Sequence, residues 1–75
     1  MSEQRVKYYM VRSDDEVDDL YRVIWEGDRP ARGQAWVRGK WIDDDTAIRD
    51  VIDLVAVDAT EAEVNAVIAS GWPSA

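Results

Sequence analysis

Apolar and polar residues alternate along much of the first half of the chain, and a period of two predicts β-strands. In residues 5–12, Val6, Tyr8 and Met10 fall on one face, with Lys7, Tyr9 and Val11 on the other. In residues 19–26, both faces carry apolar side chains. A strand that is apolar on both faces lies in the middle of a sheet or in a sheet covered on both sides.

Turn-forming residues interrupt this pattern twice. Residues 13–18 are rich in aspartate and predict a turn. Residues 27–33 hold Pro30, which has no backbone N–H to donate, between Gly27 and Gly33. This composition predicts a loop, because neither residue type supports a continuous strand ladder.

The next stretch predicts a hairpin in which residues 35–37 and 40–42 pair across a tight turn at Arg38 and Gly39. Gly39 can adopt the positive φ that such turns need. This register sets Trp36 opposite Trp41, and a cross-strand aromatic pair stabilises a small sheet.

The period then changes to that of helices. Residues 43–46 contain three acids and a threonine that can cap a short helix over residues 47–52, with Ile48, Val51 and Ile52 on one face. An extended segment is expected over residues 54–57, since apolar residues alternate there as well.

The last predicted helix has clear signals at both ends. Thr60 and Glu63 have the spacing of a capping box, in which each side chain accepts a hydrogen bond from the other residue's backbone N–H. Gly71 followed by Pro73 marks the end of the helix. The stripe expected to be buried consists of Val64, Val67 and Ile68.

Together these elements predict an α+β fold, an antiparallel β-meander of three to four strands with a C-terminal helix packed on one face. Residues 1–75 are expected to form a single small domain, with residues 1–4 and 73–75 frayed. The other sheet face is expected to present aromatic side chains to solvent or to a partner. The chain has no long apolar run, so neither a signal peptide nor a membrane span is expected, and a cytoplasmic location is predicted.

The formal net charge is −7, and it is unevenly distributed. Residues 1–42 hold equal numbers of acids and bases, whereas residues 43–75 hold eight acids and a single base. This asymmetry opposes binding to nucleic acid, because phosphates would be repelled. It favours a protein partner with a basic or apolar surface.

The composition gives little support to catalysis. Cysteine and histidine are absent, which removes the usual ligands of zinc, iron–sulfur and copper sites and the base that activates a serine. The aspartate runs at residues 14–19 and 43–45 lack the glycine-containing spacing of a calcium loop. We therefore expect no enzyme activity, no catalytic residue, no metal site and no cofactor.

The order of these motifs resembles short proteins of high-G+C bacteria. The matching features are a Tyr-Arg-Val strand (residues 21–23), the Trp36–Trp41 hairpin and an acidic helix that begins at Thr60. The resemblance implies no activity and transfers no site residue.

The best candidates for a functional surface are aromatic residues and acids. Tryptophan, tyrosine and arginine are the residue types of interface hot spots. The sequence therefore predicts a protein-binding module that uses an aromatic sheet face, an acidic C-terminal surface, or both. Alternatives are an acidic mimic of nucleic acid, a small-molecule or metal-dependent activity and, as a partner, a second copy joined through an edge strand. The candidate residues are Trp25, Trp36, Trp41, Tyr9, Tyr21, Asp43, Asp44 and Asp45.

Overall fold

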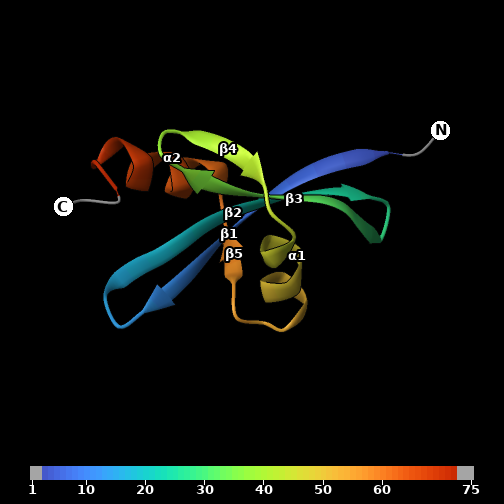
Figure 1. Ribbon diagram of the computed structural model, residues 1–75, viewed down its shortest axis with the longest axis horizontal. Coiled ribbons are helices and arrows are strands. Elements are labelled where there is room, and N and C mark those ends of the chain that lie inside the picture. The colour runs from blue at the N-terminus through green and yellow to red at the C-terminus, as the bar shows by residue number, and fades with distance from the viewer. Residues whose placement is uncertain (1–2, 73–75) are drawn as a thin grey trace.

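The computed structural model describes residues 3–72 as a five-stranded antiparallel sheet with two helices (Figure 1). The sheet order is β4-β3-β2-β1-β5, so the first four strands form a meander and β5 pairs with β1. The predicted α+β meander is therefore confirmed, and β5 adds a fifth strand to the three to four that were expected. In chain order the elements are β1 (Gln4–Ser13), β2 (Glu16–Glu26), β3 (Arg29–Val37), β4 (Lys40–Asp43), α1 (Asp45–Ile52), β5 (Val57–Ala59) and α2 (Glu61–Ala69).

The predicted β3–β4 hairpin is present with the expected register. Trp36 pairs with Trp41, and their rings meet edge to face with centroids 5.3 Å apart. Gly39 has a φ of 85°, and Arg38 also has a positive φ, of 51°. Positive φ at both central residues is the geometry whose twist matches the twist of the flanking strands.

The first hairpin is longer than predicted. Its turn is confined to Asp14 and Asp15, and β2 begins at Glu16 within the expected turn. Asp14 takes a φ of 53°, which aspartate tolerates better than most residues. Gln4, the last residue of the segment expected to be frayed, pairs with Glu26 as the first residue of β1. The predictions for residues 1–2 and 73–75, including Pro73 as a helix stop, lie outside the described residues.

The predicted loop over residues 27–33 is mostly strand. The turn is confined to Gly27 and Asp28, and β3 begins at Arg29. Pro30 is tolerated because it lies where the register of β2 and β3 shifts. Gly33 lies beneath α1, where an added Cβ would be 2.8 Å from Ile48 Cγ1. Gly33 thus continues the strand and lets the helix approach it closely.

The helix α1 starts two residues earlier than predicted because Asp44 is its N-cap and accepts a hydrogen bond from the Thr46 N–H. Ala47 is fully buried, whereas Ile52, predicted to share a face with Ile48 and Val51, is exposed. The expected extended segment over residues 54–57 is also wrong for the most part. Leu54 adopts a left-handed conformation, and β5 starts only at Val57.

The helix α2 begins as predicted. Both hydrogen bonds of the capping box form, from the Glu63 N–H to Thr60 Oγ1 and from the Thr60 N–H to Glu63 Oε1. Gly71 has a φ of 95° just after the helix, as expected for the residue that ends it. Val64 is fully buried, and Val67 and Ile68 pack beside it.

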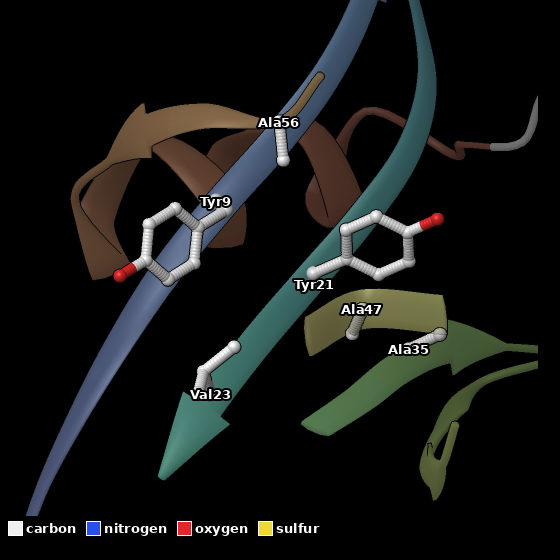
Figure 2. Packing of buried hydrophobic residues seen from close by; sticks show 6 residues of the cluster. All are labelled: Tyr9, Tyr21, Val23, Ala35, Ala47 and Ala56. Atoms are coloured by element: carbon white, nitrogen blue, oxygen red, sulfur yellow. The ribbon is translucent and has the colours of Figure 1, made fainter. Parts of the chain in front are cut away.

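The two helices cover opposite faces of the sheet. On the α1 face the core consists of Tyr9, Tyr21, Val23, Ala35, Ala47 and Ala56, which Figure 2 shows. On the α2 face it consists of Met10, Leu20 and Val64, with half-buried aromatic residues around them. The face that was expected to lack a helix is thus the one that carries α1. No helix within residues 3–72 is long and apolar enough to cross a membrane.

Candidate protein-binding surface

The helix α2 covers only part of its sheet face. It packs over Met10 and Leu20, whereas Val6, on the same face of β1, keeps 50% of its side chain exposed. Ile24, the partner of Val6 on β2, is half-buried. We call this region the open face and define it by the residues that line it: Val6, Tyr8, Arg22, Ile24, Arg32, Gln34, Trp41 and Asp43.

A polar row crosses four strands of the open face. Tyr8 pairs with Arg22, Arg22 with Gln34, and Gln34 with Asp43. The Arg22 Nε–H donates to Gln34 Oε1, and Gln34 Nε2 donates to Asp43 Oδ1 at 3.0 Å. The Nε atom of Arg32 lies 3.9 Å from the same Asp43 oxygen, and both side chains of this ion pair are exposed. These contacts hold long polar side chains in fixed positions, although the exposed ion pair adds little stability.

Aromatic rings border this polar row. The Arg22 guanidinium lies 4.7 Å from the ring centroid of Trp41, within the range of a cation–π interaction. The Tyr8 ring meets Trp41 edge to face at 6.0 Å. Trp36 also meets Trp41 edge to face, and Tyr8, Trp36 and Trp41 all pack against the core cluster under α2. The aromatic cluster therefore continues from the core to the edge of the open face.

Tyr8 also links the open face to α2. Its hydroxyl donates to Glu61 Oε2 at 2.9 Å. Burial raises the pKa of Tyr8, and the hydrogen bond and negative charge of Glu61 add to this effect, against a smaller opposite contribution from Arg22. Tyr8 therefore stays protonated and remains a donor at neutral pH.

Next to Ile24 and Arg32 of the open face, the surface forms a shallow depression of about 370 Å³. It lies where β2 and β3 change register. Its lining residues are Gln4, Ile24, Glu26, Ala31 and Arg32. Two aliphatic side chains, Ile24 and Ala31, lie among polar groups, and the depression is open to solvent, so it does not resemble an enclosed, apolar ligand site.

The structure divides the aromatic residues predicted for the site. Trp36 and Trp41 lie together on the α2 face, but Trp25 packs against the α1 core and donates its Nε1–H to the Tyr9 hydroxyl at 3.2 Å. Tyr9 and Tyr21 are 3% and 4% exposed. Their burial makes these two tyrosines core residues that present no ring to a partner.

The three consecutive acids do not act together. Asp43 belongs to the open face, whereas Asp44 caps α1 and Asp45 lies in its first turn. The capping role explains Asp44 without any ligand. Among the described residues, no three acids converge in a way that could hold a metal ion.

Another acidic group lies beside α1. The Tyr21 hydroxyl donates to Asp50 Oδ2 at 2.8 Å, and burial together with this hydrogen bond raises the pKa of Tyr21. Burial also raises the pKa of Asp19, and the charges of Asp50, Asp18 and Asp44 raise it further. These carboxylates therefore repel one another.

Sequence reasoning missed Tyr8, Gln34 and Val6 as site residues. These residues could have been found from the pairing register of the strands, since residues that lie opposite one another on neighbouring strands share a face of the sheet. That register depended on β3, much of which was predicted as a loop. Comparisons of this chain with protein-family models, curated proteins and solved structures give no match, so the surface is interpreted from its geometry.

Proposed function

We propose that this chain is a cytoplasmic, non-enzymatic protein-binding module that contacts its partner through the open face. The observation that carries the proposal is the half-covered α2 face, where the Arg22 guanidinium lies over the Trp41 ring and Val6, on the same face of β1, is exposed. Tryptophan, tyrosine and arginine are the residues that contribute most to binding energy at interfaces. Here they lie in a packed, hydrogen-bonded arrangement, which reduces the ordering cost on association.

Charge supports a basic or apolar partner. Residues 43–75 carry the whole net charge of −7, and Asp43 brings part of it to the margin of the open face. Negative charge near a binding surface accelerates encounter with a basic protein, and this acceleration weakens with salt. We expect added salt to lower the association rate more than it raises the dissociation rate.

The test compares two valine-to-glutamate variants. Val6 is exposed on the open face, and Val37 is exposed at the tip of the β3–β4 hairpin, on the side of the sheet that carries α1. A partner is first captured from the source cells with the wild-type protein and purified. Its affinity for wild type, Val6→Glu and Val37→Glu is then measured by calorimetry, with melting temperatures as a check on folding.

We expect Val6→Glu to weaken binding about tenfold or more, because it puts an unpaired charge inside the contact. Val37→Glu, with the same change of charge on the opposite side, should leave the affinity unchanged. Equal affinities of wild type and Val6→Glu would reject the open face as the contact surface. Parallel losses in both variants would mean that added negative charge weakens binding wherever it lies, which would contradict a basic partner.

A second candidate is a nucleic-acid mimic, and the shape of the molecule supports it. The chain extends 43 Å in one direction and 22 and 19 Å in the others, and its C-terminal part is strongly acidic. A mimic occupies the basic groove of a nucleic-acid-binding protein. It would compete with duplex DNA or RNA for the captured partner, whereas the module proposed above would bind without displacing either.

A further inference from the structure

The segment that joins α1 to β5 has an unusual concentration of exposed apolar side chains. Ile52, Leu54, Val55 and Val57 are 63%, 84%, 51% and 52% exposed. They occur within six consecutive residues, 52–57, which we call the corner. Clustered exposure of this kind marks an interaction surface more often than scattered single residues do.

Backbone hydrogen bonds fix the corner in place. The Val55 and Ala56 N–H groups both donate to the Asp50 carbonyl, at 2.9 and 3.0 Å, and the Leu54 N–H donates to the Val51 carbonyl. This is the Schellman arrangement of a helix end, with Leu54 at the position where glycine is favoured. The side chain of Asp50 is held in turn by Tyr21. The corner is therefore a shaped surface attached to the core.

Leucine is an energetically unfavourable residue at position 54. Its φ of 63° is strained for a leucine, and its side chain gains almost nothing from packing within the chain. The matching position after α2 is occupied by glycine, Gly71, with a φ of 95°. A leucine that carries backbone strain and remains exposed suggests a contact made outside the chain.

The corner continues into an open sheet edge. Within residues 3–72, β5 is the outermost strand and pairs only with β1, so its other side is available for a further strand. Val57 pairs with Met10 and therefore points to the α2 face, whereas Asp58 pairs with Tyr9 and points to the α1 face. A strand added to β5 would meet an apolar side chain on one face and a carboxylate on the other.

The charge of the region selects among possible occupants. Residues 49–61 hold four acids and one base. A second copy would bring the same acids against them, with a net charge of −7 on each molecule. An apolar segment with basic residues would be attracted instead.

We propose that the corner and the β5 edge bind an extended peptide segment in which apolar and basic side chains alternate. The segment adds as a sixth strand beside β5, a known mode of peptide recognition. Its apolar side chains lie beside Val57 and Leu54, and its basic side chains face Asp58, because successive side chains in a strand point to opposite faces. This surface is separate from the open face, so the two proposals stand or fall independently.

The test uses a fluorescent, end-blocked peptide of eight alternating valine and lysine residues, titrated with the protein and followed by anisotropy. A peptide with the same residues in two blocks, four valines and then four lysines, is the composition control. We expect saturable binding of the alternating peptide that weakens with salt. In ¹H–¹⁵N NMR spectra, the amide shifts should concentrate in residues 52–59.

Three variants examine the contacts, and two serve as controls. Leu54→Asn introduces a polar residue that tolerates the positive φ, and Val57→Thr introduces a hydroxyl while the side chain stays β-branched. Each variant should weaken peptide binding about tenfold through the loss of apolar contact. Asp58→Asn should weaken it about threefold and flatten its salt dependence. Val37→Thr, at the tip of the β3–β4 hairpin, and Val6→Glu, on the open face, should bind as wild type does.

Several results would overturn the proposal. The first is the absence of saturable binding at millimolar concentrations of the alternating peptide. The second is a block peptide that binds as tightly as the alternating one. The third is a Val37→Thr variant that loses as much affinity as Val57→Thr. Sedimentation of the wild type as a dimer that Leu54→Asn dissociates would assign the corner to a second copy. Flotation with neutral lipid vesicles that requires Leu54 would assign it to a lipid surface.

Discussion

On the α1 face, the helix lies close to the sheet because the residues between them are small. Gly33, Ala35 and Ala47 leave room for the backbone of α1, and the tyrosines beside them are almost fully buried. On the α2 face, Trp36 and Trp41 are too large to be covered by one short helix and remain half-exposed. The two faces have similar apolar character in the sequence, but only the face with small residues brings its helix into close contact with the sheet. Surface for a partner therefore remains on the face with large residues.

The largest effect is expected at the centre of the α2 face. Leu20 is 1% exposed and packs with Met10 and Val64. Leu20→Ala should lower the free energy of unfolding by about 3 kcal/mol, through lost burial and a residual cavity. Chemical denaturation measures it, with Val6→Ala on the exposed part of the same face as control. If both variants lose the same stability, α2 does not close over Leu20.

Close packing on the α1 face predicts the next effect. Gly33→Ala would place a Cβ atom 2.8 Å from Ile48 Cγ1 and 2.9 Å from the Asp44 carbonyl oxygen. The overlap should cost about 2 kcal/mol of unfolding free energy. Ile48→Ala in the same chain should recover part of that loss, because it removes one of the two clashes. A Gly33→Ala protein that melts like wild type would contradict the close approach of α1.

The capping box of α2 predicts a smaller effect. Thr60→Ala removes the acceptor for the Glu63 N–H and should cost about 1 kcal/mol. Thr46, in the first turn of α1, is the matched control, since there the side chain of Asp44 makes the cap. Thr46→Ala should leave the melting temperature nearly unchanged. Equal melting temperatures for both variants would mean that Thr60 does not stabilise α2.

The smallest effect concerns the acids of the α1 face. The pKa of Asp19 is raised in the folded protein, mainly by burial and then by the charge of Asp50, so its ionised form opposes folding. Asp19→Asn should therefore stabilise the protein slightly at neutral pH. The difference between variant and wild type should shrink as the pH falls through this raised pKa, because wild-type Asp19 then becomes protonated in the folded state. A difference that stays constant across acid titrations would exclude this origin.

The parts of the fold that could be predicted depend on neighbours in the chain. Thr60 and Glu63 satisfy each other's backbone groups within one turn, and Gly39 allows the turn that pairs Trp36 with Trp41. These interactions form between residues three to five positions apart, so they are visible in the order of residue types.

The errors occur where distant residues compensate for a local preference. Pro30 and Gly33 suggested a loop. Pro30 is accommodated in β3 because the pairing of β2 and β3 shifts register there, and Gly33 is covered by α1. Leu54 suggested a strand, but the end of α1 holds it in a left-handed turn. Local propensity is a weak preference that tertiary contacts override.

The sequence by itself determined that the chain alternates as a sheet, that a capped helix follows, and that the negative charge lies in the C-terminal part. Only the tertiary structure decided which tyrosines are buried, since Tyr8 and Tyr9 are neighbours of the same type on opposite faces. The polar row from Tyr8 to Asp43 likewise exists only when four strands align. The physical reason is that a strand pattern separates two faces but does not say which helix covers each one, or how completely. That coverage depends on the volumes of residues brought together from distant parts of the chain.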